Sequence, residues 1–338
     1  MPTEKEARRR ALLRGFAGKR VLAIGDLMLD EFIWGKVSRI SPEAPVPVVQ
    51  VVGESYYPGG AANVARNLRE FTPAVSLMGM AGTDAHGQKL CRLLAECGID
   101  TAAVQQEETF ATTVKTRIIA RNQQVVRVDR ERPQTPTGEQ ARRAMAALDA
   151  LIDTVDAIIV ADYGKGFLTQ PLADYICRVA SSRGRILTID PHPHTSLSWK
   201  GATAVKPNRA EAFLAAGLAP SDPAGAPLAD RQLLEAGRRL AERWECESIL
   251  ITLGEQGMLL FQRDAEPYSI PARAKDVFDV SGAGDTALAV FTLGLAAGAT
   301  AREAAEIAND ASSIVVGKLG TATVTLDELE AGAGTAGL

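Results

Sequence analysis

Short apolar runs alternate with longer helix-like segments along most of this chain, and that alternation limits the folds it can adopt. Arg20–Ile24, Ala157–Val160 and Ser248–Leu253 have the length and composition of buried strands. Gln170–Ser182 and Asp230–Trp244 have those of helices. Strands that alternate with helices predict an α/β protein whose mainly parallel sheet is covered on both faces. Ligands of such sheets bind at the loops beyond the carboxyl ends of the strands.

Two stretches do not follow this alternation. Pro45–Val52 is strand-like with no helix before it, and Thr112–Ala120 and Val125–Glu131 flank a polar turn, which predicts a hairpin. Together they predict a small antiparallel sheet lying over the main domain. Three basic residues of the first hairpin arm have the same parity and should share one face: Lys115, Arg117 and Arg121. That face is either an ordinary solvated surface or an anion site.

Composition excludes several classes of protein. The 338 residues, 46% of them hydrophobic, suffice for a large core, and the formal net charge is -4. A chain without a basic excess is not expected to bind nucleic acid or a membrane surface. Four cysteines without a metal-binding spacing, and an N-terminus without the apolar core of a signal peptide, predict a cytoplasmic protein. We expect one domain over 1–330, with a lid from segments near 31–53 and 112–131, and a disordered tail over 331–338.

The most informative segment is Asp279–Thr286, which reads Asp-Val-Ser-Gly-Ala-Gly-Asp-Thr and precedes an apolar helix, Ala287–Ala297. Glycines before a helix let backbone N–H groups converge on an anion, and the helix dipole adds positive potential there. Asp285 could be a mere N-cap, but a cap would not explain the two glycines and the second carboxylate. We predict that Asp285 accepts the proton of an attacking hydroxyl during phosphoryl transfer. The amides predicted to hold the phosphoryl oxygens are those of Gly282, Ala283 and Gly284.

This segment resembles the C-terminal signature of the ribokinase-like (PfkB) carbohydrate kinase family. Pro58–Asn63 resembles the family's N-terminal Gly-Gly motif, and Asn208–Glu211 resembles its Asn-x-x-Glu motif. Thr252–Gly254, followed by Gly257, is similar to the strand and turn beneath the nucleotide. The resemblance spans roughly residues 20 to 329. It implies a ribokinase-like three-layer α/β/α sandwich with a small antiparallel β-lid, ATP as phosphoryl donor, and Mg²⁺.

Longer strings resemble one group within that family, the kinases that phosphorylate O1 of D-glycero-β-D-manno-heptose 7-phosphate. These strings are Gly25–Asp30, Ser38–Pro47, Arg121–Gln124, Asp162–Gly166 and Val316–Thr321. One departure concerns the Asp-Pro-Lys sequence expected of the group, because this chain has Asp-Pro-His-Pro-His at 190–194. The departure bears on which sugar is bound. Members of the group are usually joined to a nucleotidyltransferase, so we expect a separate protein to perform the adenylyl step here.

The resemblance implies two sets of substrate-binding residues. Carboxylates and amides that follow the first strand or the Gly-Gly motif would contact sugar hydroxyls: Asp26, Asp30, Gly59, Gly60 and Asn63. Basic residues would bind the 7-phosphate: Arg39, Arg117, Arg121 and Lys165. Asp162 would pair with Lys165 or contact the sugar. Each of these residues could instead have a local role, in a turn or as a solvated charge.

The nucleotide side is implied in the same way. Asn208 and Glu211 would lie near the phosphates, with Glu211 holding Mg²⁺ directly or through water, although the pair is also typical of a helix-capping box. Thr252, Gly254 and Gly257 would lie under the nucleotide, and Asn309 would line the adenine pocket unless it is only a polar position on an amphipathic helix. Asp279 and Ser281 match positions that bind a monovalent cation such as K⁺.

Three alternatives to a heptose-phosphate kinase remain at this point. The chain could be a ribokinase-like kinase for another phosphosugar or a nucleoside, or a catalytically silent sugar-phosphate sensor, which intact Asp285 argues against. A dinucleotide-dependent dehydrogenase is disfavoured because Gly25-Asp26 lacks the GxGxxG pattern. The partners we expect are a small phosphosugar and ATP. A homodimer joined through the β-lid would cover exposed strand edges.

Overall fold

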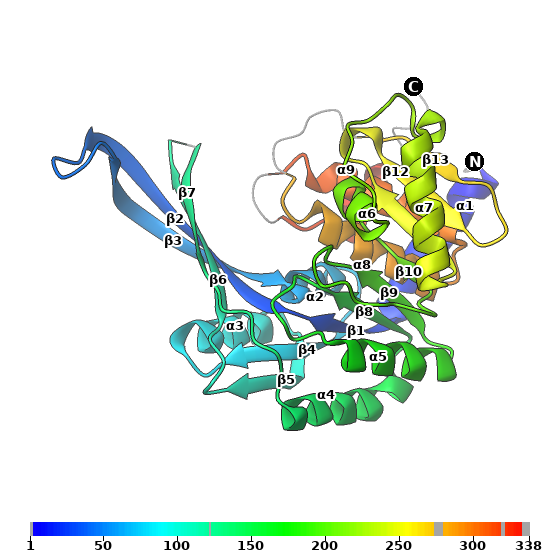
Figure 1. The fold of residues 1–338 in the computed structure, drawn as a ribbon, viewed down its shortest axis with the longest axis horizontal. Coiled ribbons are helices and arrows are strands. Elements are labelled where there is room, and N and C mark those ends of the chain that lie inside the picture. Colours follow the sequence, from blue (N-terminus) through cyan, green and yellow to red (C-terminus); the bar gives the residue numbers. More distant parts are fainter. Residues whose placement is uncertain (1–2, 122, 274–279, 319–321, 333–338) are drawn as a thin grey trace.

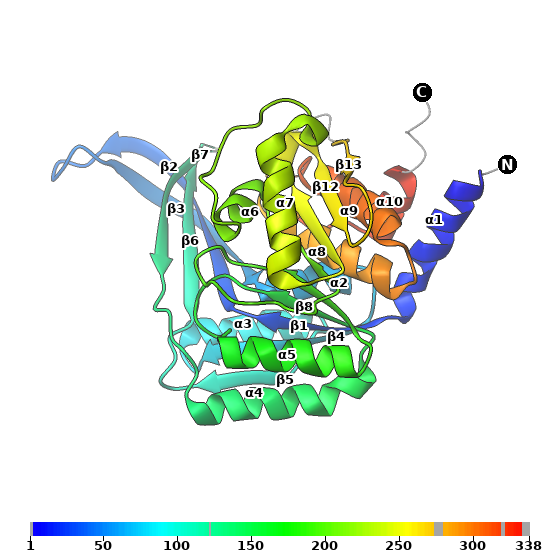
Figure 2. The ribbon, with the colours of Figure 1, turned by 45° about the vertical axis from the view of Figure 1, so that its right-hand side comes forward.

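The computed structural model describes residues 3–121, 123–273, 280–318 and 322–332. A nine-stranded sheet with the order β13-β12-β11-β10-β9-β8-β1-β4-β5 crosses the body of the molecule (Figures 1 and 2). Its strand pairs are parallel except for the two that β12 makes. The strands are β1 (Arg20–Gly25), β4 (Ala74–Gly82), β5 (Asp100–Glu107), β8 (Ala157–Ala161), β9 (Ile186–Asp190), β10 (Ala204–Val205), β11 (Ser248–Thr252), β12 (Met258–Gln262) and β13 (Tyr268–Ile270).

Helices cover both faces of this sheet, as the alternation predicted. Successive residues of β1 point to opposite faces, so Val21 and Ala23 join one apolar cluster while Leu22 and Ile24 join the other. The first cluster contains side chains of α1 (Glu4–Gly15), α2 (Ala61–Arg69), α3 (Ala85–Glu96), α8 (Ala283–Ala296), α9 (Ala301–Val315) and α10 (Leu326–Gly332). The second contains side chains of α4 (Gly138–Leu151), α5 (Gln170–Ser182), α6 (Arg209–Ala215) and α7 (Arg231–Trp244). The predicted three-layer α/β/α architecture is confirmed.

A second, four-stranded sheet projects from one end of the body (Figure 1). Its order is β3-β2-β6-β7, from β2 (Leu27–Ile40), β3 (Pro47–Gly60), β6 (Thr113–Ala120) and β7 (Gln123–Arg130). Both hairpins are antiparallel, but β2 and β6, which join them, are parallel. The segments from which the lid was predicted lie in this sheet, which we call the lid.

The structure differs from the sequence-based prediction at several element boundaries. β5 and β12 were not predicted, since β5 is an edge strand of mixed polarity and β12 returns directly after a turn at Gly257. α8 begins at Ala283, four residues earlier than expected, so Gly284 and Asp285 lie in its first turn. Ala331 and Gly332, expected in the tail, end α10. Within the described ranges, no helix combines the length and apolar content needed to cross a bilayer.

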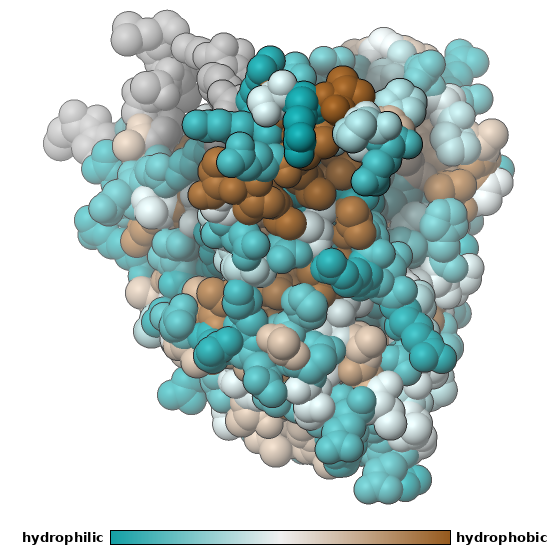
Figure 3. All heavy atoms as spheres, turned by 90° about the vertical axis from the view of Figure 1, so that its left-hand side faces the viewer, coloured by the Kyte–Doolittle hydropathy of each residue, from teal (hydrophilic) through white to brown (hydrophobic). Residues whose placement is uncertain are grey.

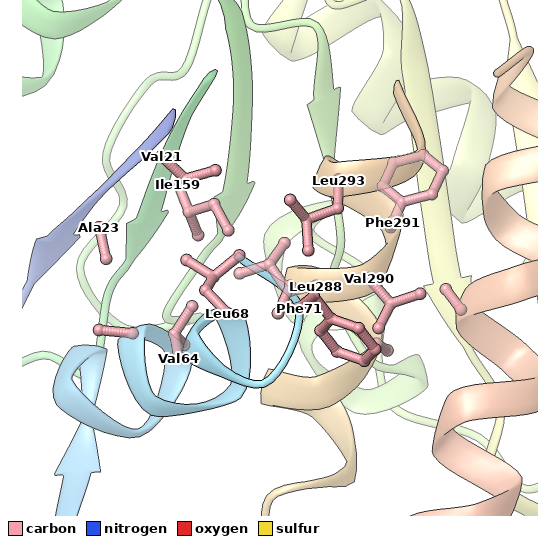
Figure 4. Close-up of a cluster of buried hydrophobic side chains, with 14 of the residues drawn as sticks. Val21, Ala23, Val64, Leu68, Phe71, Ile159, Leu288, Val290, Phe291 and Leu293 are labelled. Carbon is pink, nitrogen blue, oxygen red and sulfur yellow. The ribbon is translucent and has the colours of Figure 1, made fainter. Parts of the chain in front are cut away.

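The apolar cluster beneath the site fixes α8 against α2 and the sheet. Leu288, Val290 and Phe291 of α8 are fully buried and meet side chains of α2 and of the strands (Figure 4). Because α8 is apolar on all sides, packing rather than amphipathicity determines its orientation. The position of the first turn of α8 therefore depends on this core.

Replacing Leu288 by alanine should lower the free energy of unfolding by about 2–5 kcal/mol, because it leaves a cavity under the first turns of α8. Leu228, which is 51% exposed in the short 3-10 helix Pro227–Ala229, provides the matched control. Denaturant unfolding should show a change of under about 0.5 kcal/mol for Leu228→Ala. Equal effects of the two substitutions would contradict the role given to this core.

Candidate active site

The first anchor of the site is the buried carboxylate of Asp26, directly after β1. Its two oxygens accept hydrogen bonds from the backbone N–H groups of Tyr163, Lys165 and Phe167, at 3.0, 3.0 and 3.1 Å. β8 is the neighbour of β1, so its following loop passes over the end of β1. Asp26 therefore fixes the loop 163–167, and its predicted contact with the substrate stays a prediction.

That loop brings Tyr163 to Asp285, the predicted base. The Tyr163 hydroxyl donates to Asp285 Oδ1 at 2.5 Å, and Asn63 Nδ2 donates to Oδ2 at 2.6 Å. Burial raises the pKa of Asp285 to about 6, while the Tyr163 and Asn63 donors act in the opposite direction by stabilising the carboxylate. Burial and the nearby Asp285 carboxylate hold the pKa of Tyr163 well above 10, so the phenol remains a donor. These contacts and the raised pKa fit the general base predicted at Asp285, a role that stays a prediction.

The glycine turn beside Asp285 is not sealed inside the protein. Residues 281–285 are half-buried, and Gly282 has the left-handed φ of 81° that ends the incoming segment before α8 begins. The first amides of a helix have no carbonyl partner within the helix. The N–H groups of Gly284 and Asp285 lie in this first turn, whereas the Ala283 N–H, one of the three amides predicted to hold phosphoryl oxygens, donates to the Val280 carbonyl at 3.3 Å. The anion-holding role of the Gly282 and Gly284 amides stays a prediction.

α2 places Asn63 next to this turn. The Asn67 side chain ties the two helices together, because it accepts from the Thr286 hydroxyl at 2.6 Å and donates to the Asn63 carbonyl at 2.9 Å. The side-chain carbonyl of Asn63 is buried and has no hydrogen-bond partner within the described residues. A buried acceptor without a donor is costly, so Asn63 Oδ1 is suited to a ligand hydroxyl.

Gly59 and Gly60 allow the chain to pass close to the two aspartates at the root of the lid. A Cβ on Gly59 would lie 2.5 Å from Asp30 Oδ2, and one on Gly60, whose φ is 62°, would lie 2.4 Å from the Asp26 carbonyl oxygen. Asp30 is paired at 2.5 Å with Arg117. Asp26, Asp30, Gly59 and Gly60 thus lie together, and the sugar contact predicted for them stays a prediction.

The other predicted phosphate ligands are not all gathered. Lys165 pairs with Glu131 at 2.7 Å, at the junction of the lid and the body, and not with Asp162. Arg39 is exposed on the outer part of β2, beyond the last residue of β2 that pairs with β6. Arg121 lies in the hairpin turn with φ 51° and donates to the Val37 carbonyl. The shared face predicted for Arg117 and Arg121 is wrong, because β6 ends at Ala120 and Arg121 has left the strand for the turn, where strand alternation no longer applies.

Asp162 serves the same loop and the segment that departs from the family pattern. It accepts from the Gly164 amide at 2.9 Å and from the Thr195 hydroxyl at 2.6 Å. Burial raises the pKa of Asp162 to about 6. His192 lies against Gly164 in the loop 163–167, and its ring centroid is 5.5 Å from that of His194.

On the nucleotide side, Asn208 and Glu211 form a capping box at the start of α6. Asn208 Oδ1 accepts from the Glu211 amide at 2.9 Å, and Glu211 Oε2 accepts from the Asn208 amide at 2.7 Å. One carboxylate oxygen of Glu211 thus has no part in the cap. An oxygen donor of this kind fits Mg²⁺, which binds one or two carboxylates together with phosphates and water.

The other residues predicted for the nucleotide side lie at the end of β11, in the turn that follows it, and in the middle of α9. Thr252 ends β11, and Gly254 and Gly257 take φ values of 59° and 85° in the turn that follows. Asn309 Nδ2 donates at 2.9 Å to the carbonyl of Pro271, a residue just before the segment 274–279. Ser281 is half-buried beside the turn, whereas Asp279 lies outside the described residues.

Sequence reasoning missed two polar groups at the centre of the site. Tyr163 lay in a string used only for resemblance, although a tyrosine after a strand end is a common donor. Lys206, directly after β10, is buried and pairs with Asp190 at 3.0 Å. A lone lysine after a two-residue strand gives no periodic signal, which explains the omission.

Comparison with known proteins agrees with this geometry. The model of the pfkB family carbohydrate kinases matches residues 19–328. The chain belongs to the pfkB family. Its fold is that of Arabidopsis thaliana ribokinase complexed with ribose and ATP (TM-score 0.69, 16% identity, 93% of this chain and 98% of that one). Escherichia coli phosphofructokinase-2 in complex with potassium is similar too (TM-score 0.72, 18% identity, 93% and 97%).

Curated relatives of this pfkB member share much more sequence. The chain is 43% identical over 316 residues to the bifunctional protein HldE of Desulfatibacillum aliphaticivorans, covering 94% of this chain and 63% of that protein. It is 42% identical over 308 residues to the protein of the same name from Geobacter sulfurreducens, covering 91% and 61%. The chain therefore spans somewhat under two thirds of the length of these relatives.

Removing the Tyr163 hydroxyl should shift the acidic limb of the pH–rate profile. With the pKa of Asp285 at about 6, kcat/KM should fall as the pH drops through 6, because the base is then protonated. Tyr163→Phe removes a donor to the carboxylate, so the pKa of Asp285 should rise and the limb should move to higher pH. Tyr175→Phe, which removes an exposed hydrogen bond to Asp149, is the control. An unmoved limb in Tyr163→Phe would contradict the assignment of Asp285.

Proposed function

We propose that this protein is an ATP-dependent kinase that phosphorylates D-glycero-β-D-manno-heptose 7-phosphate at O1, giving the 1,7-bisphosphate. The observation that carries the proposal is the carboxylate of Asp285, held by Tyr163 and Asn63 in the first turn of α8. A base and a set of helix-start amides at one point meet the two needs of phosphoryl transfer: removal of a proton and stabilisation of charge.

The acceptor assignment has two supports. The long strings over 25–30, 38–47 and 162–166 resemble the heptose-phosphate kinases, and the curated relatives at 42–43% identity are named bifunctional protein HldE. In our proposal the anomeric hydroxyl points to Asp285, while Asn63 Oδ1 and the Asp30–Arg117 pair contact the sugar. Lys165 and Arg117, at the root of the lid, then receive the 7-phosphate. Arg39 and Arg121 lie farther out on the lid. They reach the 7-phosphate only if the lid bends or if a second copy of the chain supplies them.

The chain's own residues account for the remaining parts of the mechanism. The hydroxyl oxygen attacks the γ-phosphorus, its proton passes to Asp285, and the bond to the β-phosphate oxygen breaks. Mg²⁺, placed by the nucleotide phosphates and Glu211, would supply charge neutralisation. Ser281 and Asp279 are proposed for K⁺, Asn309 for the adenine side, and Thr252, Gly254 and Gly257 for the surface beneath the nucleotide. Because ATP is available in the cytoplasm, we propose that the enzyme works there.

A panel of acceptors with coupled detection of ADP tests the proposal. Heptose 7-phosphate should be turned over with a kcat/KM at least tenfold above that of the unphosphorylated heptose, of fructose 6-phosphate and of nucleosides. Asp285→Asn should lower kcat by orders of magnitude and leave ATP binding, measured calorimetrically, within a few-fold. Preference for another acceptor would change the sugar assigned to this enzyme. The departure from Asp-Pro-Lys at His192 and His194 would then account for the different sugar. Near-normal turnover by Asp285→Asn would refute the base.

The lid surface supports a homodimer. Eight of the large hydrophobic side chains that are exposed belong to the lid or its hairpin turn: Trp34, Ile40, Val46, Val51, Val52, Val125, Val126 and Val128. Seen from the lid end, apolar groups gather on this face of the molecule (Figure 3). Apolar patches rimmed by polar groups mark interaction sites, and pairing two lids covers strand edges.

Val52→Asp should therefore weaken or abolish the dimer in sedimentation experiments, because Val52 is 60% exposed on the lid and a carboxylate there opposes apolar contact. Leu228→Asp, on the body, is the control and should leave the sedimentation coefficient unchanged. A wild-type monomer at high concentration would contradict the proposed assembly without affecting the kinase assignment.

A further inference from the structure

Lys206 is a buried cation at the centre of the site whose role neither the sequence motifs nor the family match assigns. It follows β10 and is 3% exposed. Its Nζ lies 3.0 Å from Asp190 Oδ2, and among the described residues Asp190 is its one carboxylate partner within ion-pair distance. An ammonium has three donors, so this pair leaves part of its hydrogen-bonding capacity for something else.

The position of Lys206 indicates what its remaining N–H donors can bind. A Cβ placed on Gly284 would lie 3.5 Å from Lys206 Nζ, and no other heavy atom of the described residues lies within 4 Å of it, apart from its own helix backbone and chain neighbours. Because Gly284 has no side chain, space stays open between the first turn of α8 and the ammonium. Helix-start amides on one side and a cation on the other form a site for an anion. Asp285, which would take the acceptor's proton, borders the same space.

The charges around Lys206 keep it cationic. Burial alone would lower the pKa of Lys206, but Asp190, Glu211 and Asp285 outweigh that effect and raise it. Conversely, Lys206 lowers the pKa of Asp190 and Asp285 against the effect of their burial. A buried ion pair by itself contributes little to stability and is often replaceable by apolar residues. Keeping a lysine here, next to a glycine that leaves it accessible, is explained better by a ligand.

We propose that Lys206 contacts the transferring phosphoryl group and stabilises its charge during transfer, and that Asp190 is the positioning residue that holds the ammonium toward Gly284. The inference deepens the proposed phosphoryl transfer and rests on it, but not on which sugar is the acceptor. Lys206 stays protonated throughout: its N–H groups donate to non-bridging oxygens, while the acceptor proton goes to Asp285 and the leaving oxygen stays on ADP.

The decisive comparison is between Asp190→Asn and the double variant Asp190→Asn/Lys206→Met. Both lack the buried carboxylate, so they differ only in the lysine charge, and methionine preserves most of its shape. The double variant should show a kcat about 10²–10³-fold below that of Asp190→Asn, the loss typical of removing one charge-stabilising donor. The KM values for ATP and acceptor should change far less. Lys200→Met, at an exposed pair with Glu245, is the control and should match the wild type.

A binding readout separates this inference from the acceptor assignment. ADP with magnesium and aluminium fluoride, which mimics the phosphoryl group in transfer, should bind Asp190→Asn at least tenfold more tightly than it binds the double variant, with equal affinity for ADP alone. If the wild type phosphorylates none of the sugars, the proposed function is overturned, but binding of the fluoride complex by the two variants can still be compared. Equal kcat, or equal affinity for the mimic, would overturn the role of Lys206.

If the double variant shows no cooperative unfolding transition, and so has not folded properly, Gly284→Ala provides a second test. Alanine favours the helix, and its methyl group would approach no atom of the described residues closer than normal contact, so the protein should be at least as stable. Its methyl group occupies the space beside Lys206, so the fluoride complex should bind at least tenfold more weakly than to the wild type. Unchanged affinity would show that no phosphoryl group occupies that space, and would overturn the inference.

Discussion

Three backbone hydrogen bonds to the Asp26 carboxylate hold the site together. They fix the loop after β8 over the end of β1, and so determine where Tyr163 meets Asp285. β1 lies at the point where the strand order reverses, with β4 on one side and β8 on the other. A crevice forms at such a point because the following loops diverge. A carboxylate at the end of that strand can reach the amides of the neighbouring loop, which a neutral side chain of the same size would bind less strongly.

Charge is concentrated at the site at some expense of stability. Asp162, Asp190 and Asp285 have pKa values raised by burial, which means that the folded protein holds each carboxylate less favourably than water would. The pKa values of Asp162 and Asp285, both about 6, lie above the ordinary value for aspartate, so these two groups favour the folded state at low pH and lose that advantage as the pH rises through 6. Such perturbed groups collect at functional sites. The lysine at 206 and the hydroxyl of Tyr163 offset part of the penalty.

Much of this arrangement could be predicted from the sequence, and the exceptions have physical causes. Strand and helix alternation predicted the parallel sheet, and the glycines at 59 and 60 marked points where the backbone passes close to other atoms. The role of Asp26 could not be predicted, because its partners are backbone amides 137 to 141 residues away. The place of Arg121 depended on where β6 ends and the turn begins, which the alternation of side chains does not reveal. Lys206 and Tyr163 are single polar residues after strands, and only the three-dimensional order of the strands brings them to Asp285.

The lid has a mechanical consequence for the catalytic centre. β2 has 14 residues and, at about 3.3 Å per residue, extends roughly 45 Å from its root. That root is adjacent to Asp26, and the paired strand β3 ends at Gly60, where the helix carrying Asn63 begins. The lid is therefore attached at its root to the segments that carry Asp26 and Asn63, the residues that position Tyr163 and Asp285. A tilt of about 10° displaces its far end by roughly 8 Å, so contacts made far out on the ribbon exert torque on the hydrogen bonds around residue 285.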